Sequence, residues 1–84
     1  MRLSIYVSNH CANCDEAFRI ADLAREIPGL QVDLINLDST TAPVPASVFA
    51  VPTYLLDGIV VSFGNPRREE FVRGLRARGD GSDA

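Results

Sequence analysis

Two cysteines separated by two residues lie where the sequence changes from a strand pattern to a helix pattern. Apolar and polar residues alternate over residues 2–7, which predicts a strand with one buried face. Over residues 12–27 apolar residues recur at helical spacing, with charged residues on the opposite side. The pair therefore falls at the start of a helix that follows a strand directly. We expect Cys11 at or beside the helix N-cap and Cys14 one turn inside the helix.

Three further strands are predicted from the remaining β-rich segments. Residues 31–37 predict a strand parallel to the first and beside it, because a strand-helix-strand unit forms a right-handed crossover. Residues 53–56 and 59–63 predict an antiparallel hairpin around Asp57-Gly58, a dipeptide whose two positions accept positive φ. A two-strand parallel half and a hairpin half would then form one mixed sheet.

Two more helical segments are expected. Residues 46–50, after a loop, predict one or two helical turns over the other face of the sheet. The last helix opens at Asn65 as a cap, with Pro66 in its first turn. The stripe expected to be buried on the first helix consists of Ala17, Ile20, Leu23, Ala24 and Ile27, and that on the last helix of Phe71, Val72 and Leu75. The predicted fold is α/β, in the order β-α-β-(short α)-β-β-α, with one domain at residues 1–77 and a flexible tail at residues 78–84.

Composition narrows the classes of function. The chain has 84 residues, a net charge of −3 and no Lys, which argues against nucleic acid because phosphate binding needs clustered Lys and Arg. No apolar run approaches the roughly 20 residues that span a bilayer, so no membrane association is expected. We expect a cytoplasmic monomer, and in a reducing compartment a close Cys pair is more often redox or metal chemistry than a structural bridge.

The position of the cysteines predicts thiol chemistry. Unpaired backbone N–H groups at a helix start favour an anion, and thiols of Cys-x-x-Cys motifs there have pKa values of about 3.5–7.5 instead of about 8.5. Cys11 is therefore the expected nucleophile. The spacing brings Cys14 close enough to resolve a mixed disulfide. His10 could stabilise the thiolate or relay its proton, although an exposed loop position is the simpler interpretation.

Three alternatives remain open for the pair. The cysteines could be ordinary buried residues, because buried free Cys is common. They could form a non-enzymatic metal or iron–sulfur module, with His10 as a third ligand and a carboxylate or a second chain completing the set. The domain could also be an interaction scaffold whose pair is vestigial. The redox interpretation is preferred because a helix start favours thiolate, and no metal is assigned.

Two segments make residues 2–77 resemble the thioredoxin superfamily. One is the strand leading into Cys11-Ala12-Asn13-Cys14. The other runs from Val48 through Val51-Pro52-Thr53 to Gly58, followed by Gly64. The resemblance implies a thioredoxin-like fold in its glutaredoxin-size minimal version. It also implies a cis Val51-Pro52 bond that packs against the disulfide, with the Val51 backbone available to an extended substrate. Val51, Pro52, Thr53 and His10 are accordingly the expected substrate-binding residues.

The resemblance also implies an activity. The implied activity is that of a thiol-disulfide oxidoreductase in electron transport, which acts on protein or small-molecule disulfides. A reductase or a thiol donor would supply its electrons. No cofactor is expected beyond the redox-active Cys11–Cys14 disulfide. Glutathione is not supported by the motif, because no Lys precedes it and Gly64-Asn65 lacks the second Gly and the Asp of glutathione-binding members. Ile5 stands where the family has a buried acid.

Overall fold

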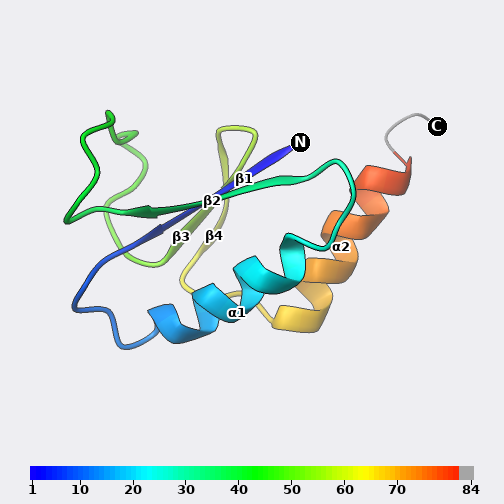
Figure 1. Ribbon diagram of the computed structural model, residues 1–84, viewed down its shortest axis with the longest axis horizontal. Coiled ribbons are helices and arrows are strands. Elements are labelled where there is room, and N and C mark those ends of the chain that lie inside the picture. Colours follow the sequence, from blue (N-terminus) through cyan, green and yellow to red (C-terminus); the bar gives the residue numbers. More distant parts are fainter. Residues whose placement is uncertain (82–84) are drawn as a thin grey trace.

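Four strands form one mixed sheet, and both helices pack against the same face of it (Figure 1). The computed structural model describes residues 1–81. Its elements in chain order are β1 (Arg2–Val7), α1 (Cys14–Ala24), β2 (Gln31–Asn36), β3 (Thr53–Leu56), β4 (Ile59–Phe63) and α2 (Arg68–Gly81). The predicted α/β class, the four strands and the two long helices are confirmed.

The strand order β2-β1-β3-β4 places β1 in the interior of the sheet. It runs parallel to β2, with Ile5 opposite Leu34, and antiparallel to β3, with Ile5 opposite Tyr54. The hairpin joining β3 to β4 turns at Asp57 and Gly58, which have φ values of 50° and 85°. The expected positive φ values are confirmed, and the antiparallel pairing of β1 with β3 brings the end of β1 beside the start of β3.

The core lies between the sheet and the helices. Alternate residues of β1 face the helices, and the buried cluster comprises Leu3, Ile5, Val7, Cys14, Ala17, Ile20, Ala21, Ala24, Ile27, Leu30, Tyr54, Leu56 and Leu75. Helix α1 presents three alanines to this cluster, which allows its backbone to lie close to its neighbours. The predicted stripe is wrong at one position: Leu23 is exposed and Ala21 is fully buried, because the contact face is centred on the alanines.

The opposite face of the sheet is covered without a helix. Residues 46–50 form turns, including a Val48 N–H to Pro45 carbonyl bond of 3.0 Å, so the short helix predicted there is wrong. Five residues between prolines cannot repay the cost of starting a helix, and Pro52 also disfavours helical backbone at Val51. Tyr6 and Leu55 are nevertheless buried on that face, and Pro45 lines a shallow hollow with them.

Helix α2 begins and ends later than expected. Its first residue is Arg68, and Asn65 does not cap it because the Asn65 side chain bonds to Tyr54 and Asn13 instead. The helix continues to Gly81, so residues 78–81 of the expected tail are helical, and residues 82–84 lie outside the described part of the chain. Arginine and alanine around position 77 favour helix, so no local signal stops it there.

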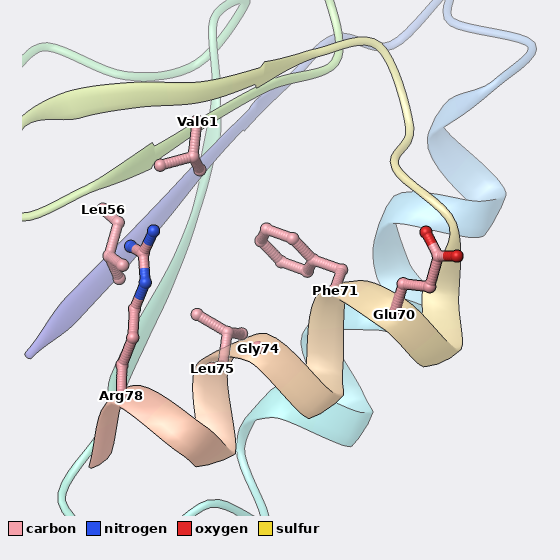
Figure 2. Close-up of a pocket in the computed structure, with 7 residues that line it drawn as sticks. All are labelled: Leu56, Val61, Glu70, Phe71, Gly74, Leu75 and Arg78. Atoms are coloured by element: carbon pink, nitrogen blue, oxygen red, sulfur yellow. The ribbon is translucent and has the colours of Figure 1, made fainter. Parts of the chain in front are cut away.

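An apolar pocket of about 180 Å³ lies between α2 and the β3–β4 hairpin (Figure 2). Phe71 and Leu75 point from α2 toward Leu56 and Val61, and Glu70 and Arg78 mark its ends. None of its lining residues belongs to the cysteine motif or to residues 51–53. Within residues 1–81 no helix is both long enough and apolar enough to cross a membrane.

Candidate active site

The loop between β1 and the cysteine motif is tied to the end of β2. The Leu37 N–H donates to the Val7 carbonyl at 2.9 Å, and the Asn9 N–H donates to Asp38 Oδ2 at 2.7 Å. Asn36 Nδ2 also donates to Asn9 Oδ1 at 2.8 Å. These polar residues were not singled out from the sequence, because their contacts join segments almost 30 positions apart. They hold the chain as it leaves the sheet.

The two cysteines form a disulfide, with their Cα atoms 5.3 Å apart. Cys11 is half-buried, whereas Cys14 is only 2% exposed and packs in the core cluster. A turn closes between them through a Cys14 N–H to Cys11 carbonyl bond of 3.2 Å. The Cys11 side is therefore the one that a substrate can approach.

The helix begins later than the sequence predicted. Its N-cap is Asn13, so Cys14 is the first helical residue instead of lying one turn inside, and Cys11 precedes the cap by two residues. Apolar periodicity defines the face of a helix but leaves its ends uncertain by one or two residues. The Asn13 side chain makes no capping bond. Backbone N–H groups of the first turn still lie next to the motif and favour an anion there.

The second segment on which the family resemblance rests, Val51-Pro52-Thr53, enters the sheet beside the end of β1, since Thr53 pairs with Tyr6. The Val51-Pro52 peptide bond is cis. Val51 and Cys11 are both half-buried against the same core cluster. Within residues 1–81 the structure records no backbone hydrogen bond of Val51. The segment therefore leaves the Val51 backbone groups unpaired within the described residues, beside the end of β1 that leads into the motif.

The other two predicted substrate-binding residues are placed differently. Thr53 is fully buried in the sheet and its hydroxyl donates to the Ala50 carbonyl at 2.6 Å, so Thr53 supports the segment from inside and is not exposed to a ligand. His10 is exposed in the turn before Cys11. The simpler interpretation of His10 as an exposed loop residue thus agrees with the structure.

Two exposed aromatic rings were missed by the sequence analysis. Phe49 and Phe63 are 78% and 56% exposed, and their ring centroids are 5.2 Å apart. Phe49 precedes Pro52 by three residues, and Phe63 pairs with Thr53 across the hairpin. Solvent-facing apolar side chains grouped in this way are typical of contact surfaces. Phe49 lies outside the strands, so its position beside Phe63 depends on how the loop before β3 packs in the folded chain.

An asparagine links the motif to the start of α2. Asn65 Nδ2 donates to the Asn13 carbonyl at 2.6 Å, and its Oδ1 accepts a bond from the Tyr54 hydroxyl at 2.8 Å. Tyr54 is fully buried, and burial raises the pKa of its phenol, with a smaller effect from the Glu16 charge. The phenol therefore stays protonated and donates. No local sequence signal could reveal that Asn65 links these two residues, because the residues next to Asn65 in the sequence fit a helix cap equally well.

A second link joins the two helices. Arg68 Nη2 and Nε donate to the Glu16 carboxylate at 2.6 and 2.9 Å. The hydrogen bond from Arg68 holds the pKa of Glu16 below its ordinary value of 4.5, and the positive charges of Arg68 and Arg19 act in the same direction. Glu16 lies in the first turn of α1. Its pairing limits the repulsion that a carboxylate there would exert on a nearby thiolate.

This pair predicts a pH-dependent stability difference. Because the folded-state pKa of Glu16 is lowered, its contribution is present above pH 4.5 and is lost as pH falls through the lowered value. Glu16→Gln is therefore expected to reduce stability at pH 7 and to match the wild type at pH 2, measured by urea unfolding. Glu70→Gln, which breaks an exposed pair between the first turn of α2 and Arg67 just before it, is the control. Equal deficits at both pH values would contradict the ion-pair explanation.

Metal ligands do not gather at the motif. Among residues 1–81 there is no group of three or more His, Cys, Asp or Glu side chains that could hold a metal ion. The fold and the disulfide at the junction of β1 with α1 instead define a class: small thioredoxin-like proteins that carry a Cys-x-x-Cys pair.

Comparison with known proteins specifies the family. The model of the thioredoxin domain matches residues 1–76. A thioredoxin from Methanocaldococcus jannaschii is 27% identical over 81 residues, covering 93% of this chain and 95% of the relative. Thioredoxin 1 from Thermosipho africanus has a similar structure, with a TM-score of 0.74, 18% identity and full coverage of both chains, which shows the shared fold. The chain belongs to the thioredoxin domain family.

Family membership and the cysteine pair together support a general kind of function. They support thiol-disulfide oxidoreductase activity, with disulfides as substrates and a reductase as partner. The resemblance stated from the motifs is therefore confirmed at the level of family and fold.

Proposed function

We propose that the protein exchanges disulfides through Cys11 as nucleophile and Cys14 as resolving thiol. The observation that carries this proposal is the unequal exposure of the two cysteines: Cys11 is half-buried and Cys14 is 2% exposed. A nucleophile must reach the substrate, whereas a resolving thiol only has to reach its neighbour. The positive end of α1 favours the thiolate over the thiol at the motif.

The reaction proceeds in two exchanges. The Cys11 thiolate attacks one sulfur of the substrate disulfide, forming a mixed disulfide while the other substrate sulfur leaves as a thiolate. Cys14, after losing its proton to solvent or to that thiolate, attacks Cys11 Sγ and displaces the second substrate sulfur. The substrate gains two electrons and two protons, and the protein ends as the disulfide. The same steps reversed would oxidise a dithiol.

Substrate contacts are proposed around the accessible side of the Cys11–Cys14 disulfide. The Val51 backbone would pair with an extended substrate segment by strand addition. Pro52 would pack beside the exchanging sulfurs, the buried Thr53 would support this segment from the sheet, and His10 would lie at the edge of the contact. The exposed rings of Phe49 and Phe63 provide apolar area beside this segment, which suits a peptide with apolar residues near its disulfide.

The electron donor, the cellular location and the oligomeric state belong to the same proposal. A reductase or a small thiol donor would return the disulfide to the dithiol, and no cofactor beyond the cysteine pair is required. We propose that the protein works as a cytoplasmic monomer in electron transport, on protein or small-molecule disulfides.

Stoichiometry tests this function directly. The dithiol protein, freed of reductant under argon, is mixed with excess oxidised glutathione and, separately, with insulin. We expect each protein molecule to lose two free thiols and to reduce one disulfide, counted by thiol titration and mass spectrometry. The Cys11→Ser/Cys14→Ser double variant supplies the background. A wild-type protein that reduces neither disulfide above that background would overturn the proposal.

A further inference from the structure

The start of α2 and the residues just before it lie along the start of α1 and contact it twice. Asn65 bonds to the backbone of Asn13, and Arg68 bonds to the side chain of Glu16. Both contacts join residues 52 positions apart, so the two segments run in parallel at a constant offset. The first contact falls between the two cysteines.

Asn65 is oriented by its surroundings. The Asn13 carbonyl can only accept a hydrogen bond, so the group facing it at 2.6 Å must be the amide NH₂. The amide oxygen then faces the Tyr54 hydroxyl at 2.8 Å. Tyr54 is itself fixed, because it is fully buried and its ring packs edge-on against Phe71 at 5.3 Å. The donor aimed at the motif is thus held by the core.

The bonded carbonyl belongs to the same peptide group as the Cys14 N–H. A hydrogen bond accepted by a peptide carbonyl polarises the group and strengthens its N–H as a donor. In the disulfide form this N–H donates to the Cys11 carbonyl over 3.2 Å, which is a long bond. A thiolate on Cys11 would offer the same N–H an anionic acceptor, and charge-assisted bonds are about twice as strong as neutral ones.

We propose that Asn65 is a positioning residue that raises the reduction potential of the Cys11–Cys14 pair by polarising the Asn13–Cys14 peptide group. This inference rests on the proposed redox function. Its effect is larger in the reduced form, where the peptide faces a thiolate, than in the disulfide form. Stabilising the reduced form makes the pair a stronger oxidant.

The test compares two substitutions of Asn65. Asn65→Leu removes the donor at similar size and without charge, and Asn65→Asp keeps an acceptor for Tyr54 while placing a carboxylate oxygen against the Asn13 carbonyl. In glutathione redox buffers at pH 7 we expect Asn65→Leu to shift the equilibrium about threefold toward the disulfide. For Asn65→Asp we expect the equilibrium to shift about tenfold toward the disulfide, which is equivalent to a reduction potential lower by about 30 mV for a two-electron couple.

A matched control separates positioning from general stability. The Glu16→Gln/Arg68→Gln variant breaks the neighbouring contact at the same offset, leaves the net charge unchanged and does not touch the Asn13–Cys14 peptide. We expect it to lower the stability of both redox forms while leaving the glutathione equilibrium within about twofold of the wild type.

A second readout does not depend on exchange with glutathione. Urea unfolding of the oxidised protein and of the protein reduced with excess dithiothreitol gives the stability difference between the two forms. We expect both Asn65 variants to destabilise the reduced form more than the oxidised form. Equal losses in both forms, with an unchanged difference, would overturn the role of Asn65. A wild-type protein that fails to exchange with glutathione would instead overturn the proposed function, and the unfolding measurement would still decide the question of Asn65.

Discussion

Cys11→Ser is expected to reduce disulfide reduction to the uncatalysed background, whereas Cys14→Ser is expected to stop the reaction halfway. A serine hydroxyl at position 11 is not ionised at neutral pH and cannot attack a disulfide, so no exchange begins. With Cys14 replaced, Cys11 still attacks, but nothing next to it can release the substrate. Incubation with oxidised glutathione followed by mass spectrometry measures the outcome: a persistent single glutathione adduct on Cys14→Ser and none on Cys11→Ser.

The two serine variants also separate the redox function from its alternatives. A metal-binding module would lose its metal with either substitution, and the two variants would behave alike. A vestigial pair would give similar, slow adduct formation in both, because neither thiol would be activated. The reverse pattern, with the adduct on Cys14 of the Cys11→Ser variant, would exchange the proposed roles and contradict the accessibility argument, since Cys14 is 2% exposed.

Ile20→Ala is expected to cost about 2–5 kcal/mol of unfolding free energy. Ile20 is fully buried on α1, within the cluster that joins this helix to β1 and α2. Its truncation removes apolar contacts and leaves a cavity that rigid neighbours cannot fill. Small domains are stabilised by only about 0.05–0.15 kcal/mol per residue, so this loss is a large fraction of the total. Urea unfolding of the oxidised protein measures it.

The control for this substitution lies on the same helix. Phe18 is larger than Ile20 but 43% exposed. Phe18→Ala is expected to change stability by less than about 1 kcal/mol, because little burial is lost and alanine has the higher helix propensity. If the two variants were equally destabilised, the packing of α1 against the sheet would differ from that described.

Local sequence signals predicted the elements whose causes are local. Alternation of apolar residues predicted β1, and Asp57-Gly58 predicted the hairpin turn, because each depends only on residues next to one another. The Cys-x-x-Cys spacing likewise predicted two sulfurs within bonding reach. The prediction of a short helix at residues 46–50 was wrong because the flanking prolines disfavour helical backbone there, whereas the prediction rested on the apolar residues alone.

The tertiary structure decided what depends on distant partners. Asn65 is a good helix cap in isolation, yet its side chain bonds to Tyr54 and to the Asn13 carbonyl. The unequal burial of Cys11 and Cys14 likewise depends on how α1 packs against the sheet. Neighbouring residues determine backbone preference, so most of the fold and the close approach of the two cysteines followed from the sequence. The partners of its polar side chains depend on contacts across the chain, which only the packed structure creates.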